Sequence, residues 1–261
     1  MKDTITRYGK WVLITGASSG IGEEYARQFA AKGHNLVLIA RREDRLVSLS
    51  DQLISKYNIE IKIIPLDLTR TDFIEVIKNE LGDIIISILI NNAGFGLNGE
   101  AVNLSQSEQQ NMVMLNCYAP VVLTNQFLPH MKQEGRGAII FLGSVVGFQP
   151  VPYMSLYSAT KAFNLIYGEA LWYELRKEGV DILAVNPGAT KTEFQRIANI
   201  ESGPSVRTAK DVVNSTFNAL GRKPSVVDGY LNKISTFSIR FLSRKVVANL
   251  WGYIANKIRT R

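Results

Sequence analysis

The stretch Thr15-Gly16-Ala17-Ser18-Ser19-Gly20-Ile21-Gly22 decides the fold of this chain. It follows residues 11–15, an apolar segment typical of a buried strand, and precedes a helical pattern over residues 23–32. The three glycines allow a tight turn and close approach of the backbone to a bound group, and the free N–H groups that begin a helix attract phosphate. The stretch therefore predicts a cradle for the pyrophosphate of a dinucleotide.

The alternation of strand and helix continues along the first 190 residues. Continuous apolar segments typical of buried strands span residues 11–15, 35–40, 59–66, 84–90, 138–142 and 180–185, and a short final strand is expected at 225–227. Such strands, separated by helices, form parallel sheets that are covered on both faces. The pattern predicts a single-domain, doubly wound α/β Rossmann fold with about seven parallel strands, whose ligands bind at the carboxyl ends of the strands.

The composition limits the class of protein. With 261 residues, 46% hydrophobic and 20% charged, the chain matches an ordinary soluble globular domain. Cys117, His34 and His130 are too few and too scattered to resemble a zinc site, so no metal is expected. The first residues contain no apolar stretch typical of a secretory signal, and we expect a cytoplasmic protein.

Five further motifs follow the glycine-rich turn, each placed after a strand or in a helix. In chain order they are Asn91-Asn92-Ala93-Gly94, Asn116, Gly143-Ser144-Val145-Val146-Gly147, Tyr157-Ser158-Ala159-Thr160-Lys161 and Asn186-Pro187-Gly188 with Thr190 and Thr192. This ordered set resembles the short-chain dehydrogenase/reductase family over about residues 9 to 230. The resemblance implies hydride transfer between a nicotinamide cofactor and a carbonyl or alcohol, and it implies a Rossmann domain over residues 1–230.

Tyr157 and Lys161 are four residues apart, so on a helix their side chains lie on one face. An adjacent ammonium lowers the pKa of a phenol from about 10 toward neutrality, and we predict that Tyr157 is the general acid. The resemblance implies that Lys161 also binds the nicotinamide ribose and that Ser144 holds the substrate carbonyl oxygen. It further implies that Asn116 anchors a water that relays protons to Lys161.

The choice of cofactor is predicted at the end of the second strand. An acid there binds the ribose 2′-hydroxyl of NAD, whereas a cation accepts the 2′-phosphate of NADP. This chain has Ala40 at the acid position and Arg41 and Arg42 directly after it. NADP(H) is therefore the expected cofactor, with Arg41 the first choice for the 2′-phosphate and Arg42 the second.

The remaining cofactor contacts are implied by the resemblance. Asp67 and Leu68 would meet the adenine, Asn92 the adenine ribose, and Thr190 and Thr192 the carboxamide and phosphates. The full expected set is Gly16, Ser18, Ser19, Gly20, Ile21, Gly22, Arg41, Arg42, Asp67, Leu68, Asn92, Ala93, Gly94, Tyr157, Lys161, Pro187, Gly188, Thr190 and Thr192.

The segments that line the substrate cleft in the family are largely apolar here, at residues 95–97, 145–154 and 194–197. They favour a hydrophobic ketone or aldehyde over a charged substrate. We predict an NADP(H)-dependent oxidoreductase that interconverts such a carbonyl and its alcohol. The alternative is a non-catalytic NADP-sensing regulatory or scaffolding protein, which would not need Asn116, Ser144, Tyr157 and Lys161 together.

The end of the chain differs in charge from the rest. From Arg222 onward it holds nine of the 30 basic residues and one of the 23 acids, so the preceding part holds 21 bases and 22 acids. Residues 246–258 place seven apolar side chains on one helical arc, and residues 231–261 are predicted to be a basic amphipathic helical extension. It could dock on its own subunit, on a partner in a homo-dimer or homo-tetramer, or peripherally on an anionic membrane. Nucleic-acid contact is not expected.

Overall fold

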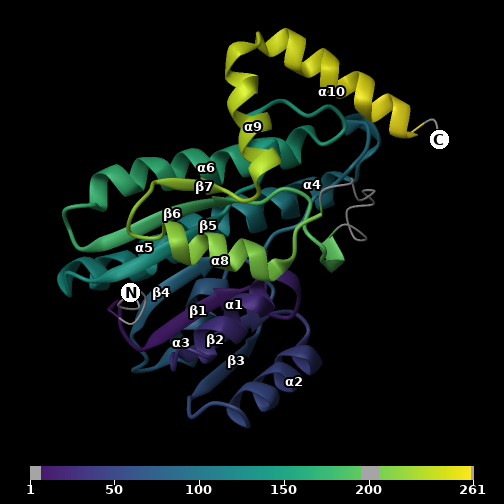
Figure 1. The fold of residues 1–261 in the computed structure, drawn as a ribbon. Helices are drawn as coiled ribbons and strands as arrows, with labels where there is room; N and C mark the ends of the chain where they lie inside the picture. The colour runs from purple at the N-terminus through teal and green to yellow at the C-terminus, as the bar shows by residue number, and fades with distance from the viewer. Residues whose placement is uncertain (1–6, 195–205, 260–261) are drawn as a thin grey trace.

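The computed structural model describes residues 7–194 and 206–259, the last two without their side chains. One parallel sheet with the strand order β3-β2-β1-β4-β5-β6-β7 runs through the molecule (Figure 1). Its strands are β1 (Trp11–Thr15), β2 (Asn35–Ala40), β3 (Ile61–Pro65), β4 (Ile86–Asn91), β5 (Gly137–Leu142), β6 (Val180–Asn186) and β7 (Ser225–Val227). The predicted doubly wound Rossmann fold with seven parallel strands is confirmed.

Helices cover both faces of the sheet. The α-helices of the described chain are α1 (Gly20–Ala30), α2 (Glu43–Ile54), α3 (Phe73–Leu81), α4 (Gln106–Val113), α5 (Ala119–Gln133), α6 (Ser155–Leu175), α8 (Ala209–Ala219), and, in the tail beyond the sheet, α9 (Tyr230–Ser238) and α10 (Arg244–Arg259). The short helices are η1 (Ala101–Asn103), the π-helix η2 (Met114–Tyr118), η3 (Val145–Phe148) and η4 (Ile239–Phe241). Between the described ends of β6 and α8, residues 195–205 lie outside the described part of the chain.

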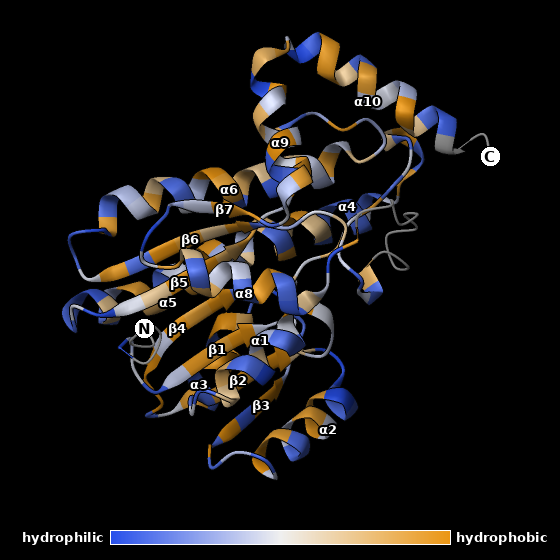
Figure 2. Cartoon of the chain, in the orientation of Figure 1, coloured by the Kyte–Doolittle hydropathy of each residue, from blue (hydrophilic) through white to orange (hydrophobic). Residues whose placement is uncertain are grey.

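Two apolar clusters, one on each face of the sheet, form the core. Successive strand residues point to opposite faces, so Ile14 joins the cluster with Phe29 of α1, whereas Leu13 joins the one with Phe73 of α3. Figure 2 shows the strands as the most hydrophobic part of the fold. Burial on both faces explains why the sequence shows continuous apolar strands and not alternating ones.

The predicted strands hold with small shifts at their ends. The third is shorter than the expected residues 59–66, and the first helix begins at Gly20 directly after the glycine turn, not at residue 23. In the second case the turn itself places the backbone in the helix, with Ser19 as the extended N-cap residue.

The tail after β7 contains α9, η4 and α10, which lie beyond the end of the sheet (Figure 1). The predicted helix over residues 246–258 is present but begins earlier, at Arg244. The tail also touches the predicted cofactor loop, since a Cβ atom on Gly188 would lie 2.4 Å from the side-chain nitrogen of Asn232 in α9. A division between residues 230 and 231 stays a prediction, and this contact argues that α9 belongs with the body.

Candidate active site

The glycine-rich turn lies at the carboxyl end of β1, as expected. Gly16 and Gly20 have φ angles of 66° and 60°, in the left-handed region that favours glycine. A Cβ atom on Gly22 would lie 2.3 Å from the carbonyl oxygen of Gly16, so α1 packs against the turn more closely than a side chain permits. The side chain of Ser19 does not cap α1, which leaves the first amide groups of the helix to another acceptor. These features fit a dinucleotide pyrophosphate.

Arg42 links this turn to a distant loop. Its guanidinium donates to the hydroxyl oxygens of Ser18 and Ser19, at 3.0 and 2.8 Å, and to the Glu193 carboxylate at 2.8 Å. Arg45 donates to the same carboxylate at 2.8 Å. These two cations hold the pKa of Glu193 at about 2. The sequence did not indicate Glu193, because its partners lie about 150 residues earlier in the chain.

Arg41 and Asp67 stand side by side at the ends of β2 and β3. Arg41 is 76% exposed, with one nitrogen 3.9 Å from Asp67. One Asp67 oxygen accepts from the amide and the hydroxyl of Thr69, which is the local turn expected of an acid at a strand end. Leu68 is buried. Arg41 is therefore the more accessible cation of the pair, whereas Arg42 is held by three side chains.

The Asn91-Asn92-Ala93-Gly94 motif secures the glycine turn. The side-chain amide of Asn92 donates to the carbonyl of Thr15 at 2.7 Å and to that of Gly16 at 3.3 Å. The amide of Ala93 donates to the Thr15 hydroxyl. Asn92 thus holds the glycine turn in place, and its expected contact with the adenine ribose stays a prediction.

Three of the expected catalytic side chains meet between β5 and α6. Ser144 follows β5, Tyr157 and Lys161 share one face of α6, and the Lys161 nitrogen lies 5.8 Å from the centre of the Tyr157 ring. The Lys161 ammonium donates to the carbonyl of Leu142 at 2.7 Å. Ser144 lies near enough to the Tyr157 phenol to favour its ionised form. The convergence that the spacing of four residues predicts is therefore present.

The pKa values of this group differ from the sequence expectation. Burial raises the pKa of Tyr157 well above the ordinary value of a phenol, and the nearby Ser144 offsets only part of this shift. Burial also lowers the pKa of Lys161 to about 8. The expectation that Lys161 lowers the pKa of Tyr157 is not met in this structure, because the ammonium is directed at Leu142 and desolvation of the phenol dominates.

Asn116 lies in η2, a π-helical turn between α4 and α5 that the sequence did not indicate. Such turns occur often at functional sites because they shift the backbone register of a helix. The Asn116 side chain accepts from the amide of Phe95 and donates to the carbonyl of Phe95. The backbone carbonyl of Asn116 accepts from the Asn164 side chain at 2.8 Å. A Cβ atom on Gly94 would lie 2.9 Å from the Asn116 oxygen and 3.5 Å from the Lys161 nitrogen. Asn116 and Lys161 therefore approach the same point of the backbone, at Gly94.

The loop after β6 is fixed by polar contacts. The carbonyl of Pro187 accepts from the amide of Val145 at 3.0 Å, and the hydroxyl of Thr190 donates to the carbonyl of Gly188. The Thr192 hydroxyl donates to the carbonyl of Thr190, and its methyl group would meet a Cβ atom on Gly20 at 3.0 Å. Pro187 to Thr192 thus lies against both the serine segment and the glycine turn, where a nicotinamide loop is expected.

Arg207 and Asp228 anchor the far side of this loop. Arg207 donates to both carboxylate oxygens of Asp228, at 3.0 and 3.1 Å, and Ser215 donates to one of them. The Asp228 side chain is fully buried, and Arg207 forms a β-bridge with Thr190. Sequence reasoning missed this pair, which ties the loop to the segment between β7 and α9.

An apolar wall closes the site beside Tyr157. The Phe194 ring lies 5.4 Å from the Tyr157 ring, and a Cβ atom on Gly96 would touch both rings at 3.1 Å. Both residues belong to segments that the sequence predicts for the substrate cleft. The others of that set at residues 195–197 lie outside the described residues.

Comparison with known proteins agrees with this geometry. Residues 10–202 match the family described as short chain dehydrogenase. The chain is 31% identical to the very-long-chain 3-oxoacyl-CoA reductase of Meyerozyma guilliermondii over 96% of its own length and 76% of the relative. The chain therefore belongs to the short-chain dehydrogenase/reductase family.

Two solved structures are similar over most of the chain. A 7beta-hydroxysteroid dehydrogenase has a TM-score of 0.87 at 26% identity and is matched over 94% of this chain and 97% of its own. A short-chain dehydrogenase from Sphingobium yanoikuyae, in complex with NADPH, has a TM-score of 0.78 at 36% identity, with 88% and 92% of the two chains covered. The protein is an oxidoreductase that acts on CH–OH and C=O groups, as predicted.

Proposed function

We propose that this enzyme uses NADPH to interconvert a bulky apolar ketone and its alcohol. The observation that carries the cofactor choice is Arg41, exposed at the carboxyl end of β2 with Ala40, not an acid, before it. The glycine turn lies beside this strand end, because the Ala17 amide donates to the carbonyl of Ile39. A 2′-phosphate on a ribose held by the turn would meet the Arg41 guanidinium, and Ala40 puts no carboxylate at the end of β2.

NADPH, when bound, supplies the hydride that reduces the carbonyl carbon. The remaining chemistry falls to side chains of the chain itself. Ser144 would donate a hydrogen bond to the carbonyl oxygen, and Tyr157 would give its phenolic proton to the same oxygen as it becomes an alcohol. Lys161, with a pKa near 8, is close enough to neutral to return a proton to Tyr157. Asn116 would position the relay between solvent and the ammonium.

The substrate class is inferred from the wall around Tyr157. Phe194 and Gly96 pack on the phenol ring and add no charge, so an apolar group next to the carbonyl is accommodated. The relatives that act on long-chain 3-oxoacyl thioesters and on steroids are consistent with such a group. A long-chain 3-oxoacyl thioester is the first candidate, and a steroid ketone is the second.

The test is the oxidation of NADPH or NADH, followed by absorbance, with a panel of short and long 3-oxoacyl thioesters, a steroid ketone and a small polar ketone. We expect kcat/KM to favour NADPH by at least about tenfold, since a charge-assisted contact is worth about 1.5 to 3 kcal/mol. It should also rise with the apolar size of the substrate. Equal use of NADH would contradict the cofactor assignment, and a preference for the small polar ketone would contradict the substrate class.

A further inference from the structure

The tail exposes large apolar side chains of the kind that are buried in the sheet and its covering helices. Half of the large apolar side chains exposed in the described parts of the chain lie between Tyr230 and Ile254. They recur at spacings of three and four residues, so each helix carries one apolar stripe. We call this set the tail stripe: Tyr230, Leu231, Ile234, Phe237, Phe241 and Leu242 from α9 and η4, and Val246, Leu250, Tyr253 and Ile254 from α10.

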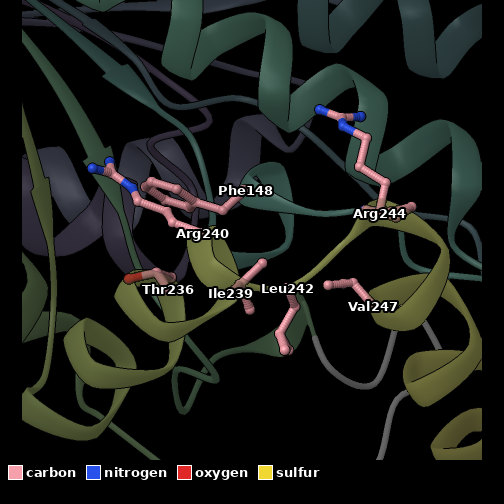
Figure 3. A pocket seen from close by; sticks show the side chains of 8 residues that line it. Phe148, Thr236, Ile239, Arg240, Leu242, Arg244 and Val247 are labelled. Atoms are coloured by element: carbon pink, nitrogen blue, oxygen red, sulfur yellow. The ribbon is translucent and has the colours of Figure 1, made fainter.

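The body covers only part of the apolar arc of α10. Val247, which lies on the same side of the helix as Leu250 and Ile254, is 2% exposed, and the Tyr153 hydroxyl donates to Asn256 at 2.6 Å. A cavity of about 280 Å³ separates Phe148 and Pro150 from the tail (Figure 3). The helix therefore docks on its own subunit at Val247, while Val246, Leu250 and Tyr253 on the rest of the arc remain exposed and open to another surface.

The charge of the tail indicates what that surface is. No Asp or Glu follows Asp228, which is itself buried against Arg207. The exposed cations of the described tail are Lys233, Arg240, Arg244, Lys245 and Lys257. Figure 3 shows the Arg240 and Arg244 side chains extending from two sides of the cavity. Arg244 and Lys245 occupy the first turn of α10, where the helix dipole disfavours positive charge. These two cations therefore do not serve the stability of the helix. Binding of an external anion explains their position.

An anionic lipid surface satisfies both properties of the tail. Apolar and aromatic side chains enter the boundary between headgroups and acyl chains, while lysine and arginine meet the headgroup phosphates. A two-fold pairing of two tails would bring like charges together, and a nucleic acid would leave the apolar stripe in water. Within the described residues no helix is long and apolar enough to cross a membrane. We propose that α9 and α10 hold the protein on an anionic lipid surface through the tail stripe and its flanking cations.

The proposal does not depend on the cofactor or the substrate. It does place the enzyme where a long apolar ketone accumulates, because such molecules partition into lipid. Turnover of a short soluble substrate should not change when the tail stripe is altered, so failure of one proposal leaves the other intact.

The test is co-sedimentation of the full chain with vesicles of phosphatidylcholine alone or with added phosphatidylserine. We expect binding to the anionic vesicles that weakens as salt is raised, and weak binding to the neutral ones. The double change Leu250→Glu with Tyr253→Glu should abolish binding. The pair Arg244→Gln with Lys245→Gln should weaken binding to anionic vesicles by about tenfold or more, since each cation near such a surface contributes about 1 kcal/mol.

Matched controls keep the result specific. Ile85→Glu changes an exposed apolar residue at the opposite end of the strands, and Lys56→Gln with Lys177→Gln removes two exposed cations outside the tail. All variants should keep the thermal midpoint of the parent chain. Equal binding to neutral and anionic vesicles would overturn the proposal, as would tail variants that bind like the controls. So would light scattering that shows Leu250→Glu with Tyr253→Glu converting an oligomer to a monomer while the parent chain ignores vesicles.

Discussion

The strand β2 and the helix α9 both contain large apolar residues, but these are buried in β2 and exposed in α9. In β2 every residue from Asn35 to Ile39 is buried, whereas in α9 only Thr236 is buried and Tyr230, Leu231 and Phe237 are exposed. The difference lies in their neighbours, because β2 pairs with two strands and is covered by helices on both faces. The body thus satisfies its apolar surface within one chain, and the tail does not. Changes in the body should alter stability and chemistry, whereas changes to the exposed side chains of the tail should not.

The largest difference between body and tail is expected in the free energy of unfolding, when Arg207 of the body and Arg240 of the tail are each replaced. Arg207→Ala leaves the buried carboxylate of Asp228 without its cation, and the free energy of unfolding should fall by about 3 kcal/mol. Arg240→Ala removes an exposed guanidinium and should change it by less than about 0.5 kcal/mol. Urea unfolding of both variants measures this. Equal losses would mean that the Asp228 pair does not hold the loop after β6.

The second difference concerns two tyrosines. Tyr157→Phe removes the transferable proton and keeps the ring, so turnover should fall by roughly a hundredfold or more while NADPH binding is kept. Tyr253→Phe, in the tail, should leave turnover of a soluble substrate unchanged. Steady-state kinetics at saturating NADPH distinguishes them. Full activity of Tyr157→Phe would remove Tyr157 from the role of general acid.

The third difference separates two exposed arginines. Arg41→Ala should raise the Kd for NADPH by about tenfold to a hundredfold, the value of a charge-assisted hydrogen bond, and leave the Kd for NADH nearly unchanged. Arg244→Ala, in the tail, should affect neither. Fluorescence titration of each variant with NADPH and with NADH gives the four dissociation constants. Parallel losses for NADPH and NADH would make Arg41 a structural residue.

The smallest expected difference is in the pH dependence of the free energy of unfolding, compared between variants of Lys161 and Lys245. The folded pKa of Lys161, about 8, lies below its unfolded value near 10.5, so between these values the unfolded chain binds the extra proton and stability rises with pH. Lys161→Met lacks this rise, and its stability relative to the parent should therefore fall by about 1 kcal/mol from pH 8 to pH 9. The matched control is Lys245→Met, which changes an exposed lysine of the tail. Urea unfolding at the two pH values is the measurement, and a constant difference for Lys161→Met would contradict the burial effect.

Local signals predicted most of the fold and part of the site. The β1 and β2 bounds and the glycine turn follow from contiguous residues, and Tyr157 and Lys161 converge because a helix fixes the geometry of four-residue spacing. Glu193 could not be found in this way, since it carries no motif and meets Arg42 and Arg45 only in the folded chain. The pKa of Tyr157 was predicted in the wrong direction because motif spacing says nothing about desolvation.

The sequence by itself determined the order of the strands along the chain, the glycine-rich turn after β1 and the set of side chains available for hydride chemistry. These depend on backbone conformation and on residue type, which short segments encode. Only the tertiary structure decided which cations stay accessible, which acids are buried and which apolar side chains remain exposed on α9 and α10. Those properties depend on solvent exclusion by elements far apart in the chain, and no local pattern records what will pack against a given surface.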